Sequence, residues 1–203
     1  MDDFNKAGNA VHGARRIWAP LAVAGVLLAL TAVEGLIPKA LPAGEELPAG
    51  TVVEFGNERD VSAQVGEGWI LDKDASSLDS GLTFVQGAVS VQLSYIGFNA
   101  AEPDGVEAVW EGMDRVFDVE RYSGVAVDLG EPSEFDTKWI EGGLTGTLQV
   151  DNRIGTAFVL PAADGTEAVE ARVLGPLHAR AEVWDSAMAI IDSVAFDDEE
   201  QQA

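Results

Sequence analysis

An uninterrupted apolar segment near the N-terminus constrains this chain more than any other feature. Residues 17–33 contain no charged side chain, and Leu36 and Ile37 extend the apolar stretch to 21 positions. As a helix, such a segment is about 31 Å long, which matches the hydrocarbon core of a bilayer at roughly 30 Å. The segment therefore predicts one N-terminal transmembrane anchor helix over residues 17–37.

Two other interpretations of this segment stay open. A cleaved signal peptide has a shorter apolar region, about 7–15 residues, followed by a small-x-small cleavage site. The triplets at 38–40 and 47–49 fit such a site poorly. A buried helix of a soluble domain is the other interpretation. The length of the segment favours a retained anchor over both.

The charges that flank the segment predict its orientation. Arg15 and Arg16 directly precede it, whereas Lys39 follows it and precedes two glutamates. Because basic flanks stay in the cytoplasm, we expect a cytoplasmic N-terminus at residues 1–16, a single pass through the plasma membrane and an extracytoplasmic C-terminal part. Glu34 lies near the outer end, where its carboxylate either reaches water or contacts a polar group of a neighbouring membrane helix.

The remainder of the chain is strongly acidic and lacks cysteine. Of the 12 basic and 35 acidic residues, 8 and 32 follow position 39, which leaves a net charge of −24. A field of this sign repels nucleic acid and anionic lipid, so neither is an expected ligand. The absence of cysteine excludes disulfides, thiolate metal sites and thiol catalysis.

Composition divides the chain after the anchor into three parts. Residues 38–50 contain three prolines and two glycines and are expected to form a semi-extended tether. Residues 51–196 are long enough for one extracytoplasmic domain with its own core. Residues 197–203 are charged and without apolar periodicity, which predicts a disordered acidic tail.

Two helices and a series of strands are expected within residues 51–196. Apolar residues recur at helical spacing over 105–122, after a candidate N-cap at Asp104, and over 176–193. The second helix carries an apolar stripe of Leu177, Ala181, Trp184, Met188 and Ile191. Strands are expected at 51–55, 61–65, 68–71, 82–86, 88–96, 124–129, 143–150, 153–160, 167–174 and 193–196.

Short links join most of these strands and indicate an α+β fold. Asp151-Asn152, for example, separates two strands by only two residues, which suits a hairpin turn. Without long β–α–β alternation, the sheet should be mainly antiparallel, with two flanking helices. On the strand at 167–174, alternation predicts that Ala168, Glu170 and Arg172 face water.

Three segments carry a resemblance to a known fold. They read VGEGWIL at 65–71, GAVSVQLSYIGF at 87–98 and WDSAMAIIDSVAF at 184–196. With the order of the elements, residues 51–196 resemble the PsbP-like α/β/α sandwich, as it occurs in membrane-anchored extracytoplasmic proteins of high-GC Gram-positive bacteria. The resemblance implies a non-catalytic binding or assembly factor of an integral membrane protein or envelope complex. It carries no signature residues.

No set of residues typical of catalysis stands out. The two histidines are His12, before the apolar segment, and His178, near the last expected helix, and no Gly-x-Ser-x-Gly motif accompanies them. Glycine-rich loops for phosphate are also missing. We therefore expect no catalytic residues, no cofactor and no enzymatic activity. A carrier of a lipid or small apolar ligand and a carboxylate-dependent envelope hydrolase are kept as alternatives.

One acidic loop is a weak candidate for a cation site. Asp72, Asp74 and Ser76 alternate as the first ligands of a calcium loop do. Ser77 and Thr83 stand where such a loop needs its glycine and its bidentate glutamate. These departures favour an acidic turn, so no metal site is expected.

Four of the five tryptophans follow the apolar segment and divide into two groups. Trp69, Trp110 and Trp184 lie in apolar periodic surroundings and are expected in the core. Trp139 has polar neighbours and precedes two glycines. We predict that Trp139 is an exposed aromatic contact for a partner, with cover of a sheet edge as the alternative.

Overall fold

The computed structural model describes residues 44–98 and 105–197. These described residues lie in one compact unit. The expected anchor at 17–37 lies outside the described residues, as does most of the expected tail.

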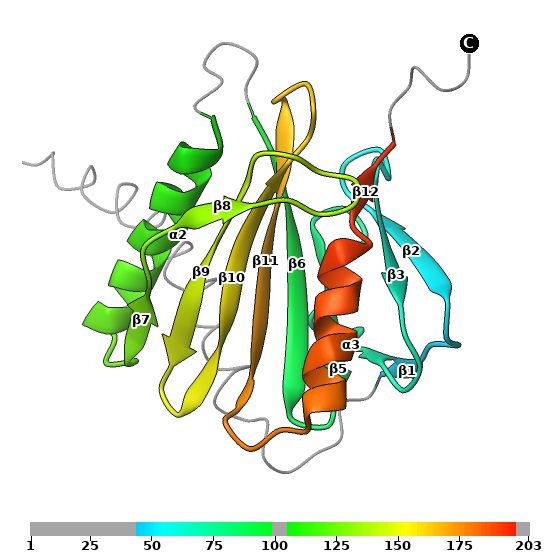
Figure 1. The fold of residues 1–203 in the computed structure, drawn as a ribbon, viewed down its shortest axis with the longest axis horizontal. Coiled ribbons are helices and arrows are strands. Elements are labelled where there is room, and N and C mark those ends of the chain that lie inside the picture. The colour runs from blue at the N-terminus through cyan, green and yellow to red at the C-terminus, as the bar shows by residue number, and fades with distance from the viewer. Residues whose placement is uncertain (1–43, 99–104, 198–203) are drawn as a thin grey trace, which may run out of the picture. The chain divides into compact units, whose positions relative to one another are not determined.

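Two sheets and two helices make up the described domain (Figure 1). The helices are α2 (Gly105–Tyr122) and α3 (Ala181–Asp192). The strands are β1 (Glu45–Glu46), β2 (Thr51–Phe55), β3 (Val61–Val65), β4 (Ile70–Leu71), β5 (Gly81–Gln86), β6 (Val89–Gly97), β7 (Val127–Leu129), β8 (Ser133–Phe135), β9 (Gly143–Val150), β10 (Arg153–Pro161), β11 (Glu167–Pro176) and β12 (Ala195–Phe196).

The strand order confirms the expected antiparallel sheet. The nine-stranded sheet runs β1-β4-β5-β6-β11-β10-β9-β7, with β8 also beside β9, and the small sheet runs β12-β3-β2. The central pair of the nine-stranded sheet, β6 and β11, is antiparallel, although α2 and four strands separate β6 from β11 in the chain. The register places Val91 opposite Val173 and Leu93 opposite Ala171, so these four side chains share one face.

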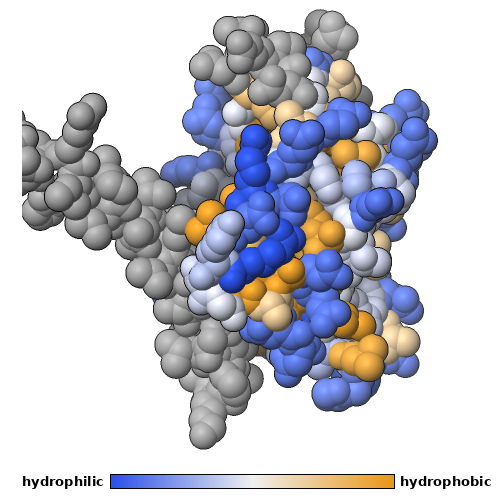
Figure 2. Space-filling model, turned by 90° about the vertical axis from the view of Figure 1, so that its left-hand side faces the viewer, coloured by the Kyte–Doolittle hydropathy of each residue, from blue (hydrophilic) through white to orange (hydrophobic). Residues whose placement is uncertain are grey.

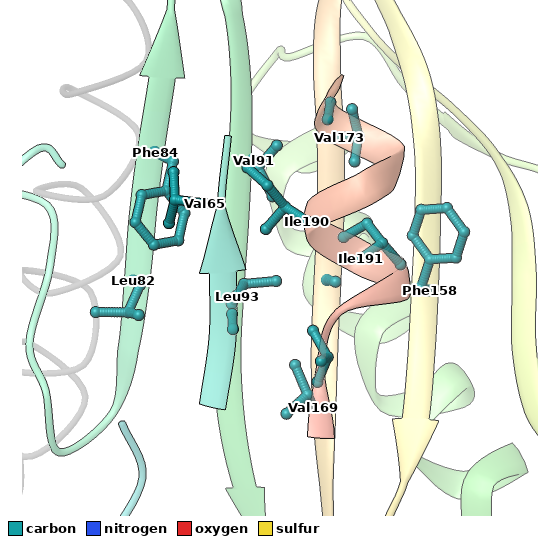
Figure 3. Close-up of a cluster of buried hydrophobic side chains, with 14 of the residues drawn as sticks. Val65, Leu82, Phe84, Val91, Leu93, Phe158, Val169, Val173, Ile190 and Ile191 are labelled. Carbon is teal, nitrogen blue, oxygen red and sulfur yellow. The ribbon is translucent and has the colours of Figure 1, made fainter. Parts of the chain in front are cut away.

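One face of the large sheet packs on α3 and the small sheet. Figure 3 shows Ile190 of α3 beside Val91 and Ile191 facing Phe158 of β10. All four side chains are essentially inaccessible to solvent. Burial of each large aliphatic or aromatic side chain is worth about 1.5–3 kcal/mol, so this cluster stabilises the contact between α3 and the sheet.

The opposite face packs on α2. Trp110, Met113 and Phe117 are buried against β7, β9 and β10. The indole of Trp110 lies on Gly146, where a Cβ atom would come within 2.8 Å of the ring. Only glycine at this position lets the indole lie against the sheet.

The two helices cover different strands on opposite faces. α3 contacts β3, β6 and β11, whereas α2 contacts β7, β9 and β10. Within the described residues, no helix therefore covers the α3 side of β9 and the N-terminal half of β10, as Figure 1 shows to the left of α3. The loop after β8 crosses the upper end of this surface.

The water-facing positions expected on β11 are wrong. Ala168 is fully buried in the cluster beneath α2. Arg172 bonds Glu170 at 2.6 Å, and its guanidinium lies 4.5 Å from the ring centroid of Phe117. Both charged side chains are less than one-fifth exposed. Alternation predicted two faces correctly, but α2 covers the face that was expected to be wet.

The last helix begins later than expected. Pro176 ends β11, paired with Arg153, and α3 starts only at Ala181. Proline is tolerated at a strand end as well as in a first helical turn, so its position did not decide between them. Leu177 is consequently 79% exposed in the connecting turn.

The apolar stripe expected on this helix is only partly its buried face. Val183, Ala187 and Ile190 are buried against the core, together with Ile191 of the expected stripe. Ala181 is exposed, and Trp184 and Met188 are partly buried beside the core.

Two short strands were not expected. Glu45–Glu46 pairs with β4, and the Leu47 amide donates to the Trp69 carbonyl at 3.1 Å, so the end of the expected tether belongs to the domain. Ser133–Phe135 pairs with β9. Neither segment has enough residues to show a period of two, so their pairing depends on the neighbouring strand.

Candidate binding groove

A shallow groove of about 400 Å³ lies on the α3 side of β9 and β10. Its floor consists of Thr147 and Gln149 of β9 and of Ile154 and Thr156 of β10. The register places Thr147 beside Thr156 and Gln149 beside Ile154. Leu148, Gly155, Asp128 and Trp184 complete the lining. We call this feature the strand-face groove.

Trp184 forms the wall of the groove on α3. Its ring lies on Gly175 at the end of β11, where a Cβ atom would be 3.1 Å from ring carbon Cζ2 and 2.9 Å from Val89. The absent side chain lets the indole pack against the sheet. Trp184 thus stands at the border between the core and the groove.

Asp128 supplies the charge of the groove. It lies on β7, directly opposite Gln149, and is exposed. No other residue in the groove lining is charged. The groove therefore combines hydroxyl, amide, indole and aliphatic groups with a single carboxylate.

The loop after β8 presents Trp139. Its side chain is 59% exposed, and Lys138 Nζ lies 4.1 Å from the ring centroid. Thr137 Oγ1 accepts hydrogen bonds from the amides of Trp139 at 3.2 Å and Ile140 at 3.0 Å, and Ile140 is buried in the α3 cluster. The loop is thus held in a defined turn, in which Ile140 is buried and the neighbouring Trp139 is exposed.

Exposed apolar side chains also lie on the outer surface of α2. Val116, Val119 and Tyr122 follow one another at spacings of three residues and are 40%, 46% and 92% exposed. Figure 2 shows this side of the molecule, where hydrophobic side chains lie between hydrophilic ones. Arg121 bonds Asp114 and Asp118 on the same helix.

A second, more polar groove of about 610 Å³ lies at the ends of β6 and β11. Its lining residues are Asn57, Asp79, Tyr95, Gly97, Phe98, Thr166 and Glu167. Burial, and then the hydrogen bond and charge of Glu167, raise the pKa of the Tyr95 hydroxyl. We call this feature the Tyr95 groove.

Glu167 has the perturbed carboxyl of the Tyr95 groove. Burial raises its pKa, and the negative charges of Asp60 and Asp164 act in the same direction. The hydrogen bond from Tyr95 acts against this increase. The carboxyl is therefore protonated more readily than an exposed glutamate.

Comparison with solved structures identifies the fold. Cyanobacterial PsbP (CyanoP) from Synechocystis sp. PCC 6803 superimposes with a TM-score of 0.52 at 14% sequence identity, covering 77% of this chain and 98% of that chain. The domain has a PsbP-like fold. The Ran-binding protein Mog1p of Saccharomyces cerevisiae has a TM-score of 0.46 at 12% identity, covering 76% of this chain and 100% of Mog1p. No family model and no curated protein matches the sequence.

In the acidic loop of the PsbP-like domain, side-chain oxygens accept hydrogen bonds from nearby backbone amides. Asp72 Oδ1 accepts hydrogen bonds from the amides of Asp74 at 3.1 Å and Ala75 at 3.2 Å. Ser76 Oγ accepts one from the Thr83 amide at 2.9 Å. Over residues 44–98 and 105–197, no three His, Asp or Glu side chains are grouped to hold a metal ion.

Several predicted residues receive no test from the described part of the domain. Arg15, Arg16 and Glu34 lie outside it, as does Asp104. In the part that is described, no helix is long and apolar enough to cross a membrane.

His178 is exposed in the turn before α3. The core position is confirmed for Trp69, which is fully buried, and for Trp110, which is 6% exposed.

The residues of the strand-face groove were not predicted as a site. Thr147 and Gln149 alternate with buried residues on β9, and the register pairs Thr156 of β10 with Thr147; both strands were themselves expected. That alternation shows that they share one face of the sheet. It does not show that α3 leaves this face open, which depends on where the last helix packs.

Proposed function

We propose that this protein is a non-catalytic, membrane-anchored accessory protein whose PsbP-like domain binds a partner outside the cytoplasm. The strand-face groove carries the proposal, because it is a concave surface lined by hydroxyl, amide and indole groups beside a filled core. Such a surface offers hydrogen bonds and apolar contact without a nucleophile and a base. Trp139 is proposed as a further contact.

The proposed location rests on the sequence. The apolar segment at 17–37 would be retained as the anchor, and Arg15 and Arg16 would keep the N-terminus in the cytoplasm. A short connection would hold the domain near the membrane surface, which favours an integral membrane protein or envelope complex as the partner. Protease added to intact protoplasts should then degrade the domain; complete protection would contradict this topology.

Affinity purification of the full-length protein in mild detergent tests the binding function. The protein would carry a C-terminal tag, and mass spectrometry would identify what accompanies it. Thr147→Arg places a large cation in the groove floor, whereas Val52→Arg places one on β2, where Val52 is 55% exposed. Thermal unfolding would confirm that both variants are folded.

Loss of a stoichiometric partner in Thr147→Arg, with retention in Val52→Arg, would support the groove as the binding site. Retention of the partner in both variants would contradict the groove as the binding site. The exposed side chains Val116, Val119 and Tyr122 on α2 would then be tested next. Replacing residues 17–37 with an unrelated transmembrane helix would show whether the segment that carries Glu34 takes part. If the protein with the replaced helix no longer retains the partner, part of the contact belongs to residues 17–37.

A carboxylate-dependent envelope hydrolase is a second candidate, because Glu167 has a raised pKa in an open groove. Perturbed carboxyls of this kind serve general acid catalysis. Release of soluble fragments from purified peptidoglycan by the wild type, and its loss in Glu167→Gln, would support this candidate. Equal release by both would exclude Glu167 as the acid.

A carrier of lipid or a small apolar ligand has less support from the described residues. Both grooves open on the surface, and polar side chains contribute to each lining. A lipid carrier needs an apolar pocket that encloses most of its ligand. Lipid extraction of the purified protein followed by mass spectrometry tests this candidate directly.

A further inference from the structure

We infer that the strand-face groove receives an extended, basic segment of a partner protein, with an apolar side chain against Trp184 and a lysine or arginine at Asp128. This inference rests on the proposed function, since it assumes that the groove is the partner site. It adds the conformation and the charge of the bound segment.

The size of the groove favours an extended segment. A helix with its side chains is about 10–12 Å across, so even two of its turns occupy more space than the groove of about 400 Å³ offers. That volume accommodates a few side chains. An extended segment advances about 3.3 Å per residue and directs alternate side chains to one side, so it can enter the groove with every second residue.

The floor supplies hydrogen-bonding groups along its length. Thr147 and Gln149 are exposed, and Thr156 is half-buried beside Thr147. A threonine hydroxyl both donates and accepts, and a glutamine amide does the same through separate atoms. These groups can therefore bond the amides and carbonyls of an extended backbone, which has no internal partners for them.

The apolar part of the groove lies on one side. Trp184 rests on Gly175 next to the core, and Ile154 lies half-buried on the floor. An indole beside an aliphatic side chain is the kind of contact that anchors protein interfaces. An aromatic or branched side chain of the segment would cover both.

The charge of the groove selects a cation. Asp128 is the one charged residue in the lining, and no basic residue lines the groove. The chain after position 39 adds a net charge of −24, which attracts cations over a longer range. An acidic segment would meet repulsion at both distances, so complementarity requires lysine or arginine.

Selection from a displayed library of short random peptides tests the inference on the full-length protein in mild detergent. Peptides enriched on the wild type would be synthesised and their affinities measured by fluorescence anisotropy at low and moderate salt. Asp128→Asn removes the groove charge. Asp185→Asn is the matched control, because it removes one exposed carboxylate on α3 that does not line the groove.

We expect the enriched peptides to contain lysine or arginine together with an aromatic or branched residue. Thr147→Arg should weaken their binding by at least about tenfold, or 1.4 kcal/mol. Asp128→Asn should weaken it about two- to fivefold at low salt, as for an exposed ion pair, and less at higher salt. Asp185→Asn should leave it nearly unchanged.

Two other outcomes overturn the inference in different ways. Peptides that lose binding in Thr147→Arg but carry no basic residue and respond equally to both Asp→Asn variants would leave the groove as the site and refute its preference for cations. If the peptides bind the Thr147→Arg variant as tightly as they bind the wild-type protein, the groove is not their site. The second result would count against the proposed function as well.

Discussion

The indole nitrogen of Trp69 donates a hydrogen bond of 2.9 Å to Ser186 Oγ. Trp69 is fully buried before β4, and Ser186 lies on α3, 117 residues later in the chain. The bond therefore ties the N-terminal strands to the last helix. It also satisfies a donor that has no access to water.

Ser186→Ala should lower the free energy of unfolding by about 1–3 kcal/mol, because it leaves the buried indole N–H without a partner. Urea denaturation of the full-length protein, followed by tryptophan fluorescence, measures the change. Ser80→Ala, at an exposed loop position, should stay within about 0.5 kcal/mol of the wild type. Equal effects of the two substitutions would show that the hydrogen bond contributes nothing specific.

Gly175→Ala should destabilise the domain by about 1–3 kcal/mol, since the added methyl group would displace the Trp184 indole or Val89. A shift of the tryptophan emission should accompany the change. Gly112→Ala provides the contrast. Its Cβ atom would meet only Arg115 at 3.8 Å within α2, so it should stabilise the protein by about 0.5–1 kcal/mol. Destabilisation by Gly112→Ala, or none by Gly175→Ala, would contradict this reading of the packing.

Glu167→Gln should change how stability depends on pH. Because burial raises the pKa of Glu167, the folded state binds its proton more tightly than the unfolded state. The ionised carboxyl therefore destabilises the fold above its raised pKa, and this penalty disappears as the pH falls below the ordinary value for glutamate. We expect Glu167→Gln to be more stable than the wild type at neutral pH, with a difference that shrinks in acid.

Denaturation midpoints of both proteins between pH 7 and pH 4 measure this difference. Glu111→Gln, at an exposed site on α2, controls for the loss of one negative charge. A wild-type protein that equals Glu167→Gln at neutral pH would show that the Tyr95 hydrogen bond offsets the burial.

Asp72→Ala should lower the free energy of unfolding by roughly 1 kcal/mol, because it removes the acceptor of two backbone hydrogen bonds in the acidic loop. Asp74→Ala should have a smaller effect, since Asp74 contributes its amide to this turn. Millimolar calcium should not change the thermal midpoint of either variant or of the wild type. A midpoint that rises with calcium in the wild type alone would make the loop a cation site.

Local patterns predicted most of the elements. The strand expected at 88–96 is β6, which buries Val89, Val91 and Leu93, and the helical spacing over 105–122 predicted α2, which buries Trp110, Met113 and Phe117. These predictions succeeded because each element is long enough to repeat its period. The two-residue β1 and three-residue β8 are too short to do so and form only beside a partner strand.

The sequence by itself determined the α+β class, the antiparallel hairpins, the burial of Trp69 and the acidity of the domain. It did so because periodicity, turn chemistry and charge are local properties. Only the tertiary structure decided that β6 lies beside β11, that Arg172, paired with Glu170, packs on Phe117 of α2, and that Trp184 borders a groove. These outcomes depend on which helix covers which strands. That choice follows from contacts between residues far apart in the chain. A period of two in the sequence shows that a strand has two faces, but not which helix covers each face.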